Sequence, residues 1–195
     1  MEFLNNIHSL CRLIFEEKGE SSLTSEQIKK LEWAMNVHGE KLMRLAYTYV
    51  KDKHIAEDMI QDVFLKAYEK QHQFKGTASY ETYLYRMTVN RCKDHLKSWH
   101  YKKYFFTEHI EDRQTSISTE ELFIRFEEDF ELGEQILSLP IKYREVVVFY
   151  FYLDYSVGDI SKTLQLSERT IYTRLRRAKE RLKKNFEKQA GEYIE

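Results

Sequence analysis

Residues 155–184 constrain the fold of this chain more than any other segment. They predict a short helix, a tight turn and a long helix whose two faces differ in chemistry. Apolar residues on the long helix recur every three or four positions and form one stripe: Ile171, Leu175, Ala178 and Leu182. Cationic and hydroxyl side chains occupy the opposite side. One face can therefore pack on a neighbouring helix while the other meets solvent or a partner.

The residues ahead of the long helix fit a helix-turn-helix. Ser156 and Asp159 form a capping-box pattern, and Ser167 is the expected N-cap of the long helix. Leu166 is expected to be the buried residue of the turn, and Gln165 stands where many such turns have Gly. A basic helix after this turn can enter a DNA major groove, where Arg reads guanine edges. A solvated amphipathic helix is the competing interpretation, and the turn spacing favours DNA.

Composition favours helices throughout the chain. One Pro and six Gly in 195 residues are too few for a turn-rich β fold, and 32% of the residues are charged. Together with the long helical periods, these values predict an all-α protein of one or two compact domains.

The net charge of −1 conceals an uneven distribution of charged residues. Residues 82–103 hold six Lys and Arg against one acidic residue, and residues 141–188 hold twelve against six. Between these blocks, residues 104–139 hold two Arg against ten Asp and Glu. Two basic blocks around an acidic segment indicate two nucleic-acid-binding units with a connector.

Hydrophobic periodicity and capping residues predict several further helices. The expected helices cover about 2–17, begin at Thr24, follow Lys53, run from Ser79 or Tyr80 to about 103, and begin at Ser118 with Glu121 as its capping-box partner. Pro140 is expected to open the last unit, and the polar stretch before Ser118 is predicted to be a linker.

The helix after Lys53 has one apolar and one acidic side. The apolar side comprises Ile60, Val63, Phe64 and Ala67. The outward side comprises Glu57, Asp58, Gln61 and Asp62. An acidic face is usually just solvated, but it also suits docking to a basic protein surface.

The next helix interleaves aromatic and cationic residues. They are Tyr80, Tyr83, Tyr85, Arg86, Asn90, Arg91, Lys93, Lys97, Trp99 and Tyr101. Such a helix can stack unpaired bases and follow a phosphate backbone, although ordinary core packing of the aromatics is an equal alternative. The loop Phe74-Lys75-Gly76 ahead of it could hold an extruded base.

Other features place the chain among cytoplasmic proteins without a cofactor. Cys11 and Cys92 fit no metal-ligand spacing and are expected to be free thiols. No apolar run approaches the roughly 18 residues of a membrane span, and the N-terminus does not resemble a signal peptide. An enzyme is disfavoured because the only Glu-x-x-His pattern, Glu69 to His72, has no paired partner.

Three motifs in this order resemble bacterial RNA polymerase sigma factors of the extracytoplasmic-function (ECF) class. They are AEDMIQDVF at 56–64, the aromatic and basic block at 74–97, and the helix-turn-helix block at 137–182. The resemblance implies a promoter-melting domain, a flexible acidic linker and a helix-turn-helix domain. The expected ranges are an N-terminal extension outside the family pattern at 1–22, a region 2 domain at 23–103, a linker at 104–118, a region 4 domain at 119–188 and a tail at 189–195.

The resemblance also implies residue roles. Docking on the clamp helices of the largest polymerase subunit would use Glu57, Asp58, Gln61 and Asp62. Capture of the minus-ten element would use Phe74, Lys75, Gly76, Tyr83, Arg86, Asn90, Arg91 and Lys97. Recognition of the minus-thirty-five element would use Arg169, Thr170, Tyr172, Thr173, Arg176 and Arg177. Tyr83 stands where the family usually has Trp, and Asp62 where it more often has Glu.

The implied partners are core RNA polymerase, including the flap region of its second-largest subunit, promoter DNA and an anti-sigma factor, which in this family is often membrane-anchored. No catalytic residue, metal or cofactor is implied. Two alternatives remain open at this point: a dimeric helix-turn-helix repressor, which leaves the acidic helix unexplained, and a protein that occupies polymerase without initiating. The apolar stripe at 2–17 could add core packing, cover a DNA surface or contact a partner.

Overall fold

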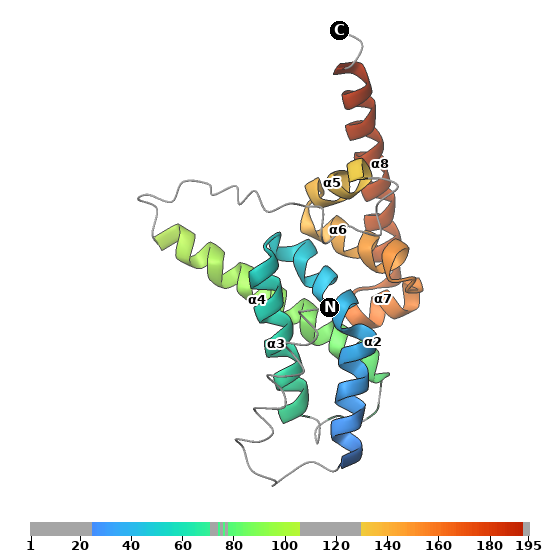
Figure 1. Cartoon of the computed structure of the whole chain (residues 1–195). Coiled ribbons are helices and arrows are strands. Elements are labelled where there is room, and N and C mark those ends of the chain that lie inside the picture. Colours follow the sequence, from blue (N-terminus) through green and yellow to red (C-terminus); the bar gives the residue numbers. More distant parts are fainter. Residues whose placement is uncertain (1–24, 71–73, 75, 77, 106–129, 193–195) are drawn as a thin grey trace. The chain divides into compact units, whose positions relative to one another are not determined.

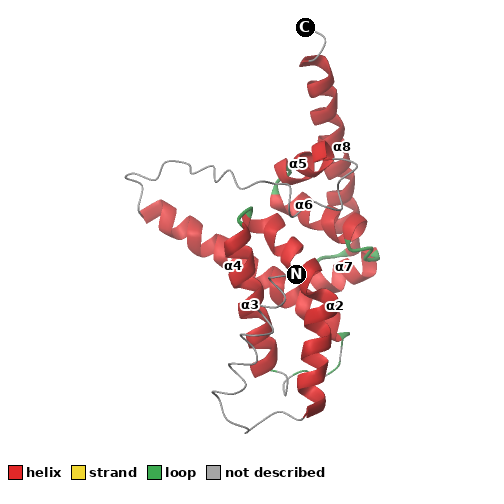
Figure 2. Cartoon of the chain, viewed as in Figure 1, coloured by secondary structure: helices red, strands yellow, loops and turns green. Residues whose placement is uncertain are grey.

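The computed structural model describes residues 25–70, 74, 76, 78–105 and 130–192. Every regular element in these ranges is a helix, which confirms the all-α prediction (Figure 2). The chain divides into two compact units, residues 1–113 and 114–195, and this division falls inside the range expected for the linker. The expected helix at 2–17, the Ser118 cap and Lys75 lie outside the described residues.

The first unit packs three helices against one another: α2 (Ser25–Val50), α3 (Lys53–Glu69) and α4 (Tyr80–Phe105) (Figure 1). Asp52 caps α3 by accepting a hydrogen bond of 3.0 Å from the Ile55 amide. Lys51, with φ of 56°, makes the sharp connection from α2. The two connected helices are thereby held antiparallel, as a short αα-hairpin requires.

The apolar side of α3 lies in the core of this unit, as predicted. Ile60, Phe64 and Ala67 are fully buried and Val63 is 1% exposed. Cys92 on α4 is also fully buried, with its Sγ 3.7 Å from the Met59 Sδ. Burial raises the pKa of the Cys92 thiol to about 12, and this cysteine is free.

The second unit comprises α5 (Phe130–Ser138), α6 (Ile141–Val147), the π-helical turn η2 (Val148–Tyr152), α7 (Val157–Leu164) and α8 (Glu168–Glu192). Helices α5, α6 and α7 all contact α8 (Figure 1). Pro140 is the N-cap of α6. The sequence predicts a helix that begins at Ser118 and leads to Pro140. Helix α5, which begins at Phe130, is the described part of that segment.

Helices α7 and α8 and the turn between them form a helix-turn-helix. Ser156 accepts a hydrogen bond of 3.1 Å from the Asp159 amide, and Ser167 accepts one of 3.2 Å from the Thr170 amide, so both predicted caps form. Gln165 has a φ of 56°, the left-handed conformation that favours Gly at this place. The burial expected for Leu166 is wrong. Leu166 is half-buried, and its carbonyl oxygen closes the turn by accepting from the Ser161 hydroxyl at 2.6 Å.

The predicted stripe on α8 forms the contact with the rest of the unit. Ile171 and Ala178 are fully buried. Ala178 belongs to a cluster with Leu139, Tyr143 and Val147, against which Leu175 and Leu182 also pack. Burial of this stripe fixes which side of α8 faces outward. None of the helices in the described ranges is both long and apolar enough to cross a membrane.

Candidate nucleic-acid interface

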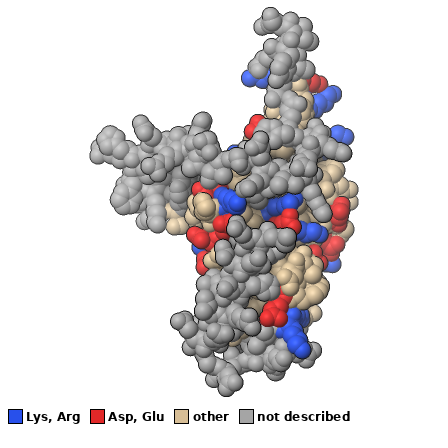
Figure 3. All heavy atoms as spheres, in the orientation of Figure 1, with Lys and Arg blue, Asp and Glu red and all other residues tan. Residues whose placement is uncertain are grey.

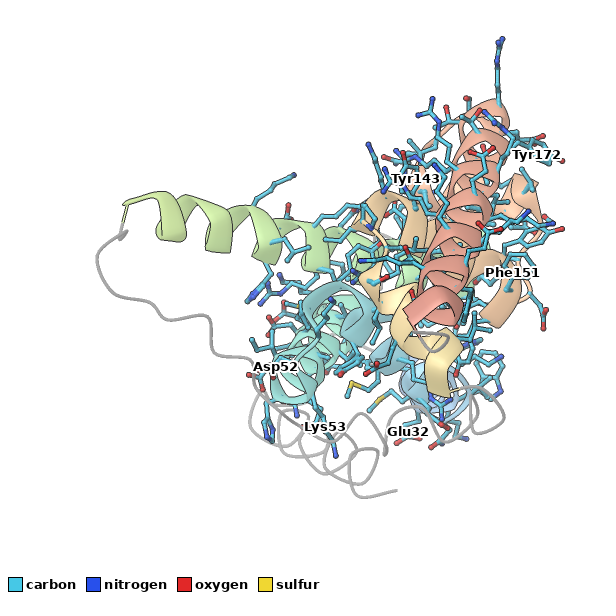
Figure 4. The ribbon with its side chains drawn as sticks, turned by 90° about the horizontal axis from the view of Figure 1, so that it is seen from above. Glu32, Asp52, Lys53, Tyr143, Phe151 and Tyr172 are labelled. Carbon is cyan, nitrogen blue, oxygen red and sulfur yellow. The ribbon has the colours of Figure 1, made fainter. Side chains whose placement is uncertain are left out.

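Helix α8 divides into a buried side and a charged outer side. Tyr172 is 60% exposed, the Arg176 side chain is 66% exposed, and Arg169 and Arg177 are also exposed. In Figure 4, Tyr143 lies on one side of α8, whereas Tyr172 lies on the other. Lys and Arg atoms line the part of α8 that leads to the C-terminus in Figure 3.

A pocket of ≈ 370 Å³ lies between α6 and the first half of α8. Its lining consists of Lys142, Tyr143, Ser167, Arg169, Thr170, Thr173, Arg174 and Arg177. The structure thus brings together four residues expected at the minus-thirty-five element: Arg169, Thr170, Thr173 and Arg177. The other two, Tyr172 and Arg176, lie outside the pocket on the exposed surface.

The pocket carries a positive potential. Arg177 forms a hydrogen bond with Tyr143, which lowers the pKa of the Tyr143 hydroxyl although burial opposes the shift; Lys142, Arg177 and Arg181 add to the lowering through their charge. The Lys142 Nζ and the Arg181 Cζ each lie 5.2 Å from the centre of the Tyr143 ring. An anion entering this pocket would meet several cations at once.

Two arginines of α8 are already paired with acids. Arg174 donates to the Glu145 Oε1 at 2.6 Å, and Glu145 is only 3% exposed, so this pair links α6 and α8. Arg176 donates to the Glu180 Oε1 at 2.7 Å, one turn further along the same helix. The first pair is structural, whereas the second is an exposed pair that solvent and salt weaken.

In the first unit, the expected base-holding residue Phe74 packs in an aromatic cluster. Its ring centre lies 5.3 Å from that of Tyr80 and 5.2 Å from that of Tyr83. The Lys30 Nζ lies 5.2 Å from the centre of the Phe74 ring and 4.8 Å from that of Tyr80. Gly76 is exposed with a φ of 68°, a conformation that explains why Gly stands there.

Tyr80 and Tyr83 differ in how far they reach the surface. Tyr80 is 7% exposed, and burial, aided by the Tyr83 charge, raises its pKa to about 12. Tyr83 is half-buried, and burial raises its pKa as well. Both hydroxyls therefore stay protonated and can donate a hydrogen bond.

The remaining α4 residues expected to bind DNA lie on and near the surface. Asn90 and Lys97 are exposed, and Arg86 is half-buried. The Lys97 Nζ lies 3.5 Å from the Asp94 Oδ1 on the same helix. These side chains share one helix, so they can act on one strand of nucleic acid.

Arg91 and Asp62 form an ion pair that the sequence does not predict. The Arg91 Nε and Nη2 lie 2.9 and 2.8 Å from the Asp62 Oδ2 and join α4 to α3. The sequence assigns Asp62 to polymerase and Arg91 to DNA, yet the structure binds them to each other. Both groups remain partly accessible, with side-chain exposures of 45% and 30%.

The other predicted docking residues of α3 differ in exposure. Asp58 is exposed, whereas Glu57 and Gln61 are half-buried. The Glu57 Oε2 lies 3.7 Å from the Nδ1 of the exposed His54. Asp58 is therefore the most accessible carboxylate of the four predicted docking residues.

Sequence reasoning missed Lys30, Lys142 and Tyr143. Lys30 meets Phe74 and Tyr80 only through tertiary packing, and no local pattern signals such a contact. Lys142 and Tyr143 lie in the first turn of α6, where a cation beside an aromatic residue was a usable signal. Among the described residues, no three His, Cys, Asp or Glu side chains gather as metal ligands would.

Comparison with known proteins identifies both units. Residues 35–100 match the sigma-70 region 2 family, and residues 129–182 match the sigma-70 region 4 family. A protein that joins these two domains is a sigma factor, a subunit that directs RNA polymerase to promoters. The chain belongs to the ECF class of sigma-70 factors, as its sequence resemblance predicts.

Relatives of known identity cover most of the chain. ECF RNA polymerase sigma factor SigW of Bacillus subtilis is 26% identical over 161 residues, which cover 78% of this chain and 86% of SigW. The RNA polymerase sigma-H factor of Pseudomonas aeruginosa is 27% identical over 156 residues, which cover 74% of this chain and 79% of that protein.

Two solved structures have the same fold. One is the sigma factor RpoE in complex with the anti-sigma factor NepR from Bartonella quintana, with a TM-score of 0.66 and 18% identity over 82% of this chain and 98% of that one. The other is CnrH in complex with the cytosolic domain of CnrY, with a TM-score of 0.59 and 19% identity over 82% of this chain and 88% of that one.

Proposed function

We propose that the two units contact a promoter at two places, with α8 on the minus-thirty-five duplex and α4 on the melted minus-ten strand. The division of α8 carries this proposal: Ile171 and Ala178 are fully buried, while Tyr172 and Arg176 project outward. A helix held in this way can lie in a major groove without exposing its apolar stripe.

At the minus-ten element, we assign base capture to the loop around Phe74 and Gly76 and to Asn90. Tyr83 is half-buried and offers part of its ring for stacking on a base. Arg86, Arg91, Lys75 and Lys97 are assigned to nearby phosphates. Extruding a base costs a few kcal/mol of unstacking, which these contacts would offset.

Core polymerase is proposed to dock on the outward side of α3. Asp58, the exposed carboxylate, is assigned the central contact, and Glu57, Gln61 and Asp62 surround it. The second unit is assigned to the flap region of the second-largest subunit. Acidic groups facing a basic surface speed and orient such docking.

The chain is proposed to act only by binding its partners and to break no covalent bond itself. We place this action in the cytoplasm, where polymerase works. One structural neighbour was solved with the anti-sigma factor NepR, and the other with the cytosolic domain of CnrY. We therefore assign an anti-sigma partner to this chain. The partner would keep the chain inactive until a signal releases it.

Run-off transcription tests this proposal. Purified chain is combined with core polymerase from the same bacterium on fragmented genomic DNA of that organism. Discrete transcripts that require the chain are expected, and Asp58→Asn should lower their yield by weakening association with core. No chain-dependent transcript from any fragment would reject a sigma function, and palindrome-specific binding without polymerase would favour a repressor.

A further inference from the structure

The pocket lies along one flank of α8, beside α6, and does not include Tyr172 or Arg176. At 100° per residue, Thr170, Thr173 and Arg177 follow one line along the flank that faces α6. Tyr172 and Arg176 lie on a different line, outside the pocket. The residues expected to contact the upstream duplex therefore fall into two groups with different surroundings.

The four cationic side chains of the pocket donate hydrogen bonds and cannot accept them, whereas its four hydroxyls can do both. Its lining offers one ammonium, three guanidinium groups and the hydroxyls of Tyr143, Ser167, Thr170 and Thr173. The Thr173 hydroxyl already donates to the Arg169 carbonyl oxygen at 2.8 Å. A base edge presents donors as well as acceptors, whereas a phosphate presents acceptors only. The four cations therefore match the charge and the acceptor oxygens of a phosphate better than they match a neutral base edge.

The cations of the pocket are only partly neutralised. Glu145 engages Arg174, but within the described part of the chain no acid pairs with Lys142, Arg169 or Arg177. Arg177 is held in place by Tyr143 through a hydrogen bond that does not cancel its charge. The pocket therefore keeps charge for an incoming anion, in an arrangement that the surrounding contacts fix in advance.

We propose that this pocket binds one phosphodiester of the promoter backbone beside the minus-thirty-five element, with Lys142 and Tyr143 of α6 as contacts additional to those of α8. The inference rests on the proposed function and divides its upstream residues by task. Thr170 and Arg177 hold the backbone, and Tyr172 and Arg176 face the base edges. A fixed phosphate sets the register in which the remaining side chains meet the bases.

Methylphosphonate scanning tests the pocket. The probe is the upstream duplex of the promoter that gives the strongest run-off product, with one neutral methylphosphonate at each backbone position in turn, bound by the holoenzyme. Wild type should lose affinity about tenfold at one position or two adjacent ones, as expected when a charged hydrogen-bonded contact is lost. Lys142→Gln should bind the unmodified duplex more weakly and no longer respond at that position, and its salt slope should fall by about 1.

Lys183→Gln is the matched control, because Lys183 lies on α8 outside the pocket, with a 77% exposed side chain that pairs with Glu187. It should keep the wild-type phosphate profile. Tyr143→Phe keeps the ring that packs in the core cluster and removes only the hydroxyl, so it should weaken the response at the same position. An unchanged profile in Lys142→Gln, with normal run-off by wild type, overturns the pocket alone. Absence of run-off by wild type rejects the proposed function itself.

Discussion

Helices α4 and α8 have similar residue compositions but bury different residues. Both are long, carry several Lys and Arg and contain tyrosine. On α4, Tyr80 and Tyr85 are 7% and 0% exposed, because α4 packs against both α2 and α3. On α8, Tyr172 is 60% exposed. The same residue type is thus core in one helix and surface in the other, and neighbouring helices decide which.

One arginine of each helix shows a second difference. Arg91 of α4 is bound across the helix interface to Asp62 of α3. Arg176 of α8 is bound along its own helix to Glu180. A tertiary pair fixes the direction of a guanidinium group, whereas an exposed pair within one helix is weak and exchanges readily. Contacts through Arg91 should therefore be more rigid than those through Arg176.

Replacing one tyrosine in each helix gives the largest expected difference. Tyr85→Ala should lower the free energy of unfolding of the first unit by about 3–5 kcal/mol, because it removes a fully buried ring. Tyr172→Ala should change the unfolding of the second unit by no more than about 0.5 kcal/mol. Urea unfolding followed by circular dichroism measures both. Equal destabilisation by the two changes would show that α8 is packed like α4.

The Asp62–Arg91 pair offers the next largest effect. If Asp62 acts chiefly by orienting Arg91, Asp62→Asn should leave affinity for core polymerase unchanged and slow promoter opening to the same degree as Arg91→Gln. The pair itself should contribute no more than about 1 kcal/mol to folding, since both side chains are partly exposed.

Core titration and 2-aminopurine fluorescence at the minus-ten element separate these effects. Asp58→Asn serves as the comparison because Asp58 is exposed on the same helix. Loss of core affinity in Asp62→Asn as large as that in Asp58→Asn would mean that Asp62 contacts the polymerase directly.

Releasing Arg176 from its ion pair should have a smaller effect, and it should strengthen promoter binding rather than weaken function. Glu180→Gln removes the acid that holds Arg176 and should tighten promoter binding by the holoenzyme about twofold, which corresponds to the roughly 0.3–0.5 kcal/mol of such a pair. Filter binding at low salt measures the change. Glu187→Gln frees Lys183 near the end of α8. It should have less effect if Arg176, rather than Lys183, contacts the DNA.

The smallest expected effect is on pH dependence in the first unit. Burial lowers the pKa of His38 from 6.5; nearby Glu81 opposes the shift and Lys41 adds to it. The unfolded chain therefore takes up this proton first as pH falls. Stability is fully present above about pH 6.5 and declines as pH falls through the lower folded pKa.

His38→Phe should reduce this decline while keeping an aromatic ring beside Trp33 and Tyr85. Thermal unfolding between about pH 7.5 and about pH 5.5 measures the difference. His54→Phe is the control, because the His54 side chain is 80% exposed. A wild-type decline that persists unchanged in His38→Phe would assign it to other groups.

Local sequence signals predicted much of this fold. The caps at Ser156 and Ser167, the α8 stripe and the apolar side of α3 depend on neighbouring residues, and each formed as expected. Leu166 was predicted wrongly because a turn can close through a backbone oxygen as well as through a buried side chain.

Tertiary relationships were less predictable. The Asp62–Arg91 pair joins residues on separate helices, and the pocket joins Lys142 of α6 to Arg177 of α8. No helical period encodes such meetings, since they depend on how two helices cross. The sequence therefore predicted which side chains face outward better than it predicted which of them face one another.

The rate at which the buried thiol of Cys92 is alkylated would report how often the first unit opens. A thiol reacts with alkylating reagents as the thiolate, and with its pKa at about 12 and no exposed surface Cys92 is shielded while α3 and α4 stay together. In a chain with Cys11→Ser, each labelling event would record one separation of these helices. Its rate, followed during holoenzyme assembly, would report how far polymerase holds this unit closed.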